Sequence, residues 1–175
     1  IGKVGIPDRI LLKPGKLTPE EFEIMKTHTT LGRDAIIAAE TGTTQDNPFF
    51  RYAKEIAYSH QEKWDGSGYP EGLVGNTIPL SARLMAVADV YDALISERVY
   101  KPAYSHEQAV EIIRDGRGSH FDPDMVDAFL TLSEEFRRIA QQFADAEPAR
   151  LAQVDRLAAD LPMERIELTS REEPL

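Results

Sequence analysis

Two histidines and an aspartate are the residues of this sequence whose types and setting best suit chemistry. His28 and His60 each lie near the end of an expected helix and are followed by polar turns, where a side chain can face a cleft. Asp89 stands in the apolar run 86–90, where a carboxylate costs on the order of several kcal/mol unless a cation or hydrogen-bond donors satisfy it. Two imidazoles and a carboxylate from three helices form a familiar ligand set for Fe, Mn or Zn. We therefore predict a metal site containing all three residues.

Each of these residues also has a structural interpretation. A lone histidine on a helix is more often a hydrogen-bonded structural residue than a ligand, and Asp89 could instead cap a neighbouring helix. The sequence contains two further histidines, His106 and His120. They stand in the first turn of a capped helix and in the turn before residues 122–123, so we interpret them as surface or capping positions outside the site.

Helices must position these side chains. Capping boxes at Thr18–Glu21 and Ser105–Gln108, together with helical spacing, indicate helices. The predicted helices span residues 19–28, 30–39, 49–60, 80–96, 106–116 and 123–143. The clearest of them, 80–96, carries an apolar stripe of Leu84, Val87, Ala88, Tyr91 and Ile95. Residues 62–79 bunch glycines and prolines and are expected to form an ordered or mobile surface loop. No strand pattern appears, so the fold class is all-α, a bundle of five or six principal helices.

Composition excludes several classes of protein. The 175 residues suit one domain of ordinary size, which we place at 1–145, followed by a charged helical tail at 146–175. Cysteine is absent, which excludes disulfides and thiolate chemistry. A net charge of −10 disfavours nucleic acid polymers and anionic membranes as partners. No apolar run of about 18 residues and no signal peptide appear, so we expect a cytoplasmic protein without a membrane segment.

Four short strings in the sequence, taken together, resemble the HD-GYP family. They are IGKVGIPD at 1–8, KTH at 26–28, HQEKWDGSGYP at 60–70 and ADVYDAL at 88–94. One glycine-rich turn would be weak support, but four spaced motifs in the family's order, covering residues 1 to about 125, are specific. The resemblance implies an HD-superfamily helical bundle and a metal-dependent phosphodiesterase that hydrolyses cyclic di-GMP in bacterial signalling.

The resemblance also implies roles for single residues. By similarity, the metal ligands are His28, His60 and Asp89, and Lys3 is the catalytic lysine beside the metal. Substrate contacts are implied for Lys3, Asp92, Arg98 and Lys101. Arg98 and Lys101 lie three residues apart, as a clamp on phosphate oxygens would require, although a solvated surface pair would show the same spacing.

Two departures from the family pattern qualify these roles. The family's first motif reads His-Asp-Ile-Gly-Lys and this sequence begins at its Ile, so we expect a truncation just after the His-Asp pair, with weak metal binding and little turnover by this polypeptide. Gln61 replaces the second histidine of a His-His-Glu string, and a glutamine is a weak metal ligand. We therefore expect two divalent ions, Fe or Mn, and the linear dinucleotide pGpG as main product, with GMP as a further one.

Partners and alternatives complete the interpretation. Beyond cyclic di-GMP, the loop around Tyr69 could meet diguanylate cyclase (GGDEF) proteins or stack on guanine, but we expect Tyr69 and Trp64 to pack against their own loop. A homodimer could form through the tail helices. The alternative functions are a degenerate domain that binds the nucleotide or a cyclase without cleaving it, and a hydrolase of another nucleotide such as a mixed cyclic dinucleotide.

Overall fold

The computed structural model describes residues 1–41, 47–96 and 103–159, with side chains described as far as residue 143. Within these ranges the chain is helical and contains no strand, which confirms the all-α class. Its contacts divide it into two units, Ile1–Glu134 and Glu135–Leu175, and the fold below is that of the first. The domain boundary expected after residue 145 stays a prediction.

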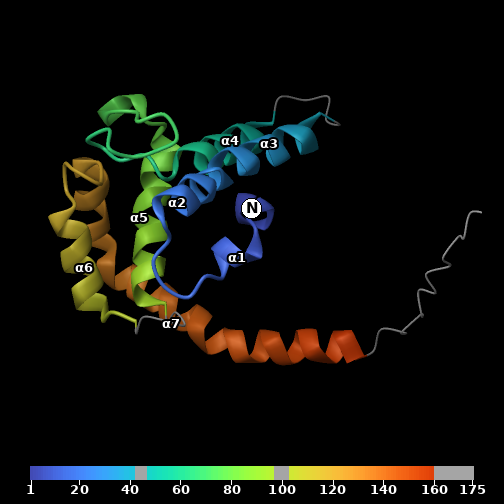
Figure 1. The fold of residues 1–175 in the computed structure, drawn as a ribbon. Helices are drawn as coiled ribbons and strands as arrows, with labels where there is room; N and C mark the ends of the chain where they lie inside the picture. The colour runs from blue at the N-terminus through green and yellow to red at the C-terminus, as the bar shows by residue number, and fades with distance from the viewer. Residues whose placement is uncertain (42–46, 97–102, 160–175) are drawn as a thin grey trace, which may run out of the picture. The chain divides into compact units, whose positions relative to one another are not determined.

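Six principal helices follow two short helical turns at the start of the chain (Figure 1). In order, the elements are η1 Gly2–Gly5, α1 Asp8–Leu11, α2 Pro19–Lys26, α3 His28–Glu40, α4 Pro48–Ser59, η2 Gly75–Thr77, α5 Leu80–Ile95, α6 His106–Asp115 and α7 Pro123–Ala159. The expected helices therefore form, except that His28 begins α3 instead of ending the helix before it, and that α7 continues beyond the predicted end near residue 143. Among the described helices, none is long and apolar enough to cross a membrane.

Side-chain caps start three of these helices. Thr18 accepts a hydrogen bond from the amide of Glu21, whose carboxylate accepts one from the Thr18 amide, as the predicted capping box requires. Ser105 and Gln108 form the second predicted box. Asn47 caps α4, which the sequence analysis did not anticipate. These caps fix the starts of α2, α4 and α6.

The core lies where α5 packs against α4 and α6, while α3 packs against α4 and η1. Its best-buried residues are Ile6, Ile10, Ile78, Ala82, Ala86, Val87, Tyr91, Ala109, Ile113, Phe121, Val126 and Phe129. The predicted stripe on α5 is right at Val87 and Tyr91 but wrong at Leu84, which is 53% exposed. Ala82 and Ala86 are buried on this helix instead, because small side chains let the neighbouring helices approach closely.

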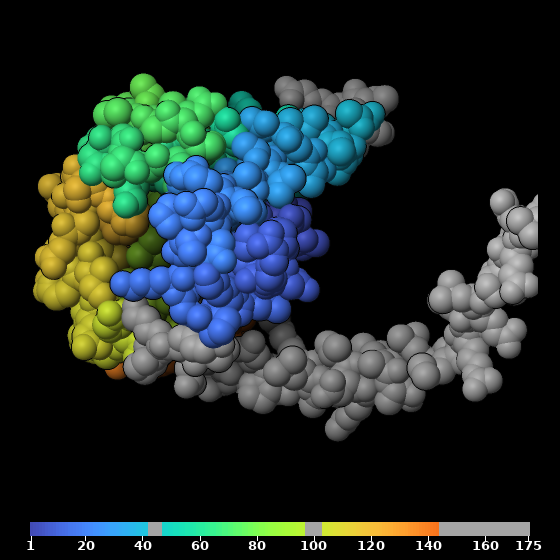
Figure 2. Space-filling view, in the orientation of Figure 1, coloured from blue at the N-terminus to red at the C-terminus, as the bar shows by residue number. Residues whose placement is uncertain are grey.

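The loop between α4 and α5 is ordered. The buried carboxylate of Glu62 accepts hydrogen bonds from the amides of Glu71 (2.8 Å) and Leu73 (3.0 Å), which ties the two arms of the loop together. Gly68 lies so close to the opposite arm that a Cβ there would be 2.2 Å from the amide nitrogen of Lys63. The loop also lies beside the turn 116–121, as Figure 2 shows, and donates two backbone hydrogen bonds to it.

Candidate metal centre

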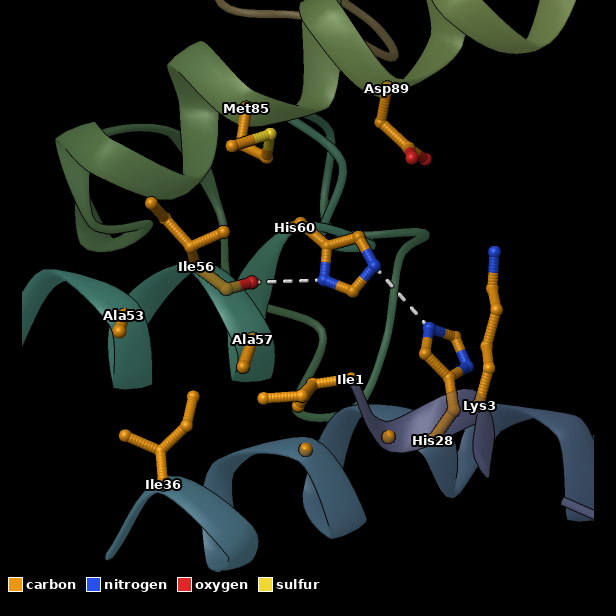
Figure 3. Close-up of a pocket in the computed structure, with 12 residues that line it drawn as sticks. Ile1, Lys3, His28, Ile36, Ala53, Ile56, Ala57, His60, Met85 and Asp89 are labelled. Atoms are coloured by element: carbon orange, nitrogen blue, oxygen red, sulfur yellow. Dashed lines mark hydrogen bonds between the residues drawn. The ribbon is translucent and has the colours of Figure 1, made fainter. Parts of the chain in front are cut away.

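One pocket collects residues from four helical elements. It has a volume of about 360 Å³, and its polar wall consists of Lys3 from η1, His28 from α3, His60 from the end of α4 and Asp89 from α5 (Figure 3). The rest of the lining is apolar or glycine: Ile1, Gly2, Gly32, Ile36, Ala53, Ile56, Ala57 and Met85. The structure thus brings four of the predicted site residues to one place.

A close backbone approach places Lys3 beside His28. Gly2 is buried, and a Cβ on it would lie 1.8 Å from the carbonyl oxygen of His28 and 2.6 Å from the amide nitrogen of Gly32. Only glycine at position 2 lets η1 lie directly on α3. The side chain of the next residue, Lys3, therefore runs alongside the His28 ring, as Figure 3 shows.

The rings of His28 and His60 face each other through their Nε2 atoms. The Nδ1 atoms of His28 and His60 lie 2.7 Å from the Met25 carbonyl and 2.9 Å from the Ile56 carbonyl. A carbonyl only accepts, so each Nδ1 carries the proton and, in the neutral ring, each Nε2 holds a lone pair. The two Nε2 atoms are 3.3 Å apart. In their neutral forms the two rings therefore point lone pairs at each other.

This arrangement suits a cation between the rings. Burial lowers the pKa of His28, which favours its neutral form, and the charge of Lys3 acts in the same direction. A metal–nitrogen bond of about 2.0–2.1 Å with tetrahedral angles separates two imidazole ligands by roughly 3.3–3.4 Å. The observed 3.3 Å between the Nε2 atoms matches that spacing. The pair thus has the protonation and the separation of two ligands of one ion.

Asp89 faces the histidine pair from α5, on the other side of the pocket (Figure 3). It is half-buried, and its carboxylate accepts a long hydrogen bond of 3.5 Å from the side-chain amide of Gln61. Within the part of the chain that the structure describes, no group of three or more His, Cys, Asp or Glu side chains is arranged to hold a metal ion. The histidine pair is preformed, and Asp89 as its third ligand stays a prediction.

Tyr69 packs against the site through two aromatic neighbours. Its ring meets the His28 ring edge-on with centroids 6.3 Å apart, and it meets Phe22 of α2 in the same way at 5.9 Å. These two partners lie outside the loop that carries Tyr69, and the expectation that Tyr69 packs on its own loop stays a prediction. Burial, and then the charge of Asp89, raise the pKa of Tyr69 to about 12. Trp64 does contact its own loop, because its carbonyl accepts a hydrogen bond of 2.9 Å from the amide of Gly75.

The remaining predicted substrate residues are not brought to the pocket by the described structure. Asp92 lies one turn after Asp89 on α5, is exposed, and is not among the residues that line the pocket. Arg98 and Lys101 lie outside the described residues. The roles of all three therefore stay predictions.

The other two histidines lie outside the pocket, as expected, but they are not surface residues. His106 is half-buried, and its Nδ1 shares a hydrogen bond of 2.8 Å with the hydroxyl of Tyr91. His120 is half-buried and stacks on Phe121 with ring centroids 4.1 Å apart. His106 faces α5 through Tyr91, and His120 faces its own turn through Phe121.

Comparison with known proteins agrees with this arrangement. The sequence profile of the HD domain family matches residues 1–125. The chain is 62% identical over 149 residues to a Vibrio cholerae protein named "Probable cyclic di-GMP phosphodiesterase", a match covering 85% of this chain and 34% of that protein. A second Vibrio cholerae protein, named "Cyclic di-GMP phosphodiesterase", is 60% identical over 148 residues, which are 83% of this chain and 30% of that protein.

A third relative, from another bacterium, is also similar over most of this chain. The Thermotoga maritima protein named "Cyclic di-GMP phosphodiesterase" is 47% identical over 145 residues, covering 83% of this chain and 38% of that protein. The chain therefore spans about a third of the length of these relatives.

Proposed function

Since the chain belongs to the HD domain family, and within it to the HD-GYP type, we propose that it acts as a metal-dependent phosphodiesterase on cyclic di-GMP. Its main product is the linear dinucleotide pGpG, and its role is in bacterial second-messenger signalling. The observation that carries the proposal is the pair of inward-facing Nε2 atoms of His28 and His60, 3.3 Å apart in a pocket that also contains Lys3.

The residues that would hold the metal are His28, His60 and Asp89. A divalent cation bound by these residues would supply charge to neutralise the phosphate oxygens and would activate water for attack on phosphorus. Two ions of Fe or Mn are proposed, because Gln61 contributes an amide where a further imidazole would favour a third ion. The carbonyls of Met25 and Ile56 keep both rings in the tautomer that presents Nε2 to the ion.

The positive groups around the pocket would bind the phosphates. Lys3 stands at the pocket wall beside His28 and neutralises charge that develops on the phosphate oxygens. Arg98 and Lys101 clamp the same group from beyond the end of α5, and Asp92 contacts the substrate from that helix. Local cations are needed because the chain as a whole carries a net charge of −10 and does not attract anions broadly.

Partners of the protein are proposed on the same grounds. The ordered loop 61–79 is the proposed surface for diguanylate cyclase proteins, and the part of α7 after residue 145 is the proposed surface for a homodimer. A cytoplasmic location fits a substrate made inside the cell.

The test uses the protein at its native length, loaded anaerobically with Mn²⁺ or Fe²⁺. We expect hydrolysis of cyclic di-GMP to pGpG, lost when His28→Ala and His60→Ala are combined and retained in the control His120→Phe, whose stack on Phe121 lies outside the pocket. Binding without cleavage would support the degenerate receptor instead. Faster cleavage of a mixed cyclic dinucleotide would reassign the substrate.

The phosphate clamp has its own test. Charge reversal of Arg98 and Lys101 together should raise the KM for cyclic di-GMP. Unchanged affinity in that double variant would refute the clamp and leave the metal centre unaffected.

A further inference from the structure

We infer that Arg83, which does not line the pocket, is a positioning residue for it. Arg83 fastens the loop 61–79 to α5 and to the start of α7, and this loop holds Tyr69 against His28. The inference rests on the proposed function only for its consequence in catalysis. The positioning itself concerns the metal-free chain.

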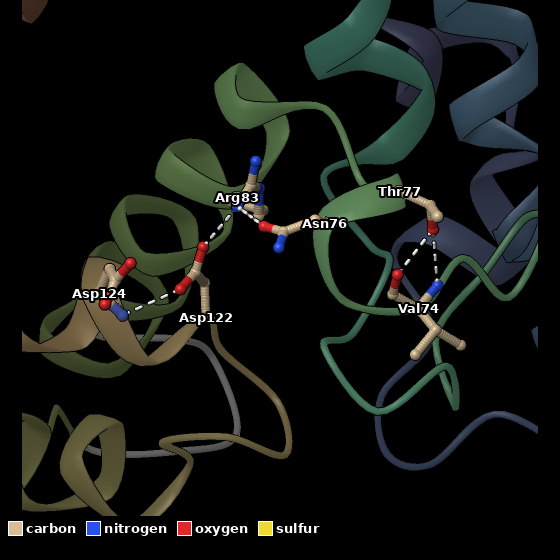
Figure 4. Close-up of polar contacts among 6 residues, drawn as sticks. All are labelled: Val74, Asn76, Thr77, Arg83, Asp122 and Asp124. Atoms are coloured by element: carbon tan, nitrogen blue, oxygen red, sulfur yellow. Dashed lines mark hydrogen bonds and ion pairs between the residues drawn. The ribbon is translucent and has the colours of Figure 1, made fainter.

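A single guanidinium joins three elements at this point (Figure 4). Its Nη1 atom donates to the carboxylate of Asp122 at 2.7 Å and to the side-chain oxygen of Asn76 at 3.0 Å. The Asp122 side chain is only 3% exposed, and its other oxygen accepts a hydrogen bond from the amide of Asp124 at the start of α7. Arg83 thereby connects α5, the cap of α7 and the second arm of the loop, residues 71–79, which we call the descending arm.

Arg83 also contacts the first arm of the loop, residues 61–66, which we call the ascending arm. Its guanidinium carbon lies 5.8 Å from the centre of the Trp64 ring, within the range of a cation–π contact. The carbonyl of Trp64 in turn accepts a hydrogen bond from Gly75 in the opposite arm. Both arms of the loop therefore contact the side chain of Arg83, one through Asn76 and the other through Trp64.

The loop transmits this placement to Tyr69. The buried Glu62 carboxylate binds the amides of Glu71 and Leu73, and the amide of Tyr69 donates to the Gln61 carbonyl at 3.1 Å. Tyr69 therefore sits in a framework whose two arms end at the Arg83 contacts. If those contacts are lost, the arms can separate and the edge-on contact between Tyr69 and His28 loosens.

The energetics favour positioning over bulk stability as the role of this group. A buried ion pair is seldom more stabilising than well-packed apolar residues of the same volume. Here the Nε atom of Arg83 is buried without a hydrogen-bond partner among the residues that the structure describes, which adds a further cost. A costly group in contact with three elements is better suited to fixing their relative placement than to stabilising the fold.

The experiment compares Arg83→Met and Asn76→Ala with a matched control, Arg117→Met. Asn76→Ala removes only the contact to the descending arm, so it reports even if Arg83→Met folds poorly. Arg117 forms an exposed ion pair with Asp127, which joins the neighbouring turn to α7 without touching the loop. The control therefore loses an arginine contact of α7 but none of the loop.

Two readouts need neither metal nor substrate. Trp64 is the single tryptophan of the chain, so its quenching by acrylamide reports exposure of the loop. The Cε1–H proton resonance of His28 senses the ring current of Tyr69, whose centroid is 6.3 Å away. We expect both loop variants to increase quenching and to shift the His28 resonance toward its position in Tyr69→Ala, with no change in Arg117→Met. A His28 resonance that stays in place while the variants remain folded would overturn the inference.

Catalysis supplies the third readout. Arg83→Met and Tyr69→Ala should each lower kcat/KM by about tenfold, the scale on which partners of metal ligands act. Because both act through one contact, the double variant should also lose about tenfold and not the product of the two losses. Additive losses would refute the coupling. Absence of hydrolysis in the parent protein would refute the proposed function, and the two metal-free readouts would still decide the role of Arg83.

Discussion

Replacing Gly2 by alanine perturbs the contact that sets Lys3 beside the histidine pair. The new Cβ would lie 1.8 Å from the carbonyl oxygen of His28 and 2.6 Å from the amide nitrogen of Gly32. Both atoms belong to the backbone of α3 and cannot rotate aside. Ordinary van der Waals contact starts at 3.4 Å, so η1 must retreat by about 1.6 Å.

The retreat predicts losses in stability and in activity. Overpacking of this kind costs about 1–3 kcal/mol, and in a chain of this size each kcal/mol lowers the Tm by roughly 2–4 °C. Lys3 moves with η1, and a misplacement of about 1 Å at a reacting group can cost about 10²-fold. We expect Gly2→Ala to lower kcat/KM for cyclic di-GMP by about that factor.

Thermal melting by circular dichroism and steady-state hydrolysis by the native-length protein measure the two effects. Gly5→Ala is the matched control, because the Cβ there would meet only the Cδ1 atom of Leu31, at 2.8 Å. Leu31 is 40% exposed and can rotate away. Parental activity and Tm in Gly2→Ala would refute the close approach of η1 to α3, and equal losses in both variants would show that the helical turn itself tolerates no side chain.

Two further predictions concern the loop and acid stability. The Glu62 carboxylate accepts hydrogen bonds from two backbone amides, and Glu62→Gln would turn an NH₂ group toward one of them. The free energy of unfolding should therefore fall by about 1–3 kcal/mol, and Trp64 should become more accessible to acrylamide. Unchanged melting would argue against that role of the carboxylate. Burial lowers the pKa of His120, so the unfolded chain binds more protons and stability falls as the pH drops below 6.5. His120→Phe keeps the stack on Phe121 and should flatten the dependence of the unfolding free energy on pH below 6.5, and an unaltered slope would contradict this assignment.

The starts of the helices could be predicted from the sequence because the capping signals that mark them are local. Thr18 and Ser105 cap the helices that follow them, as predicted, since a cap and its amide partner lie within one turn. The burial of α5 was less predictable. Leu84 is larger than Ala82 and Ala86, yet the alanines are buried, because the neighbouring helices approach too closely for a leucine there.

The sequence could single out candidate residues for the site but not their geometry. The types and setting of His28 and His60 marked them as candidates, whereas the facing of their Nε2 atoms depends on two backbone carbonyls that no sequence pattern specifies. The contact of Tyr69 with Phe22 and His28 joins residues more than 40 positions apart in the chain. Such contacts follow from the packing of the loop on α2 and α3, which local spacing does not encode.

The central claim is that His28 and His60 bind one cation between their Nε2 atoms. Titration of the apo protein with Zn²⁺, followed through the Cε1–H proton resonances of the four histidines, tests it most directly. We predict that the resonances of His28 and His60 change together and saturate at the same added zinc, while those of His106 and His120 stay in place. A change confined to one of the two, or saturation of each at a different zinc concentration, would contradict the shared site.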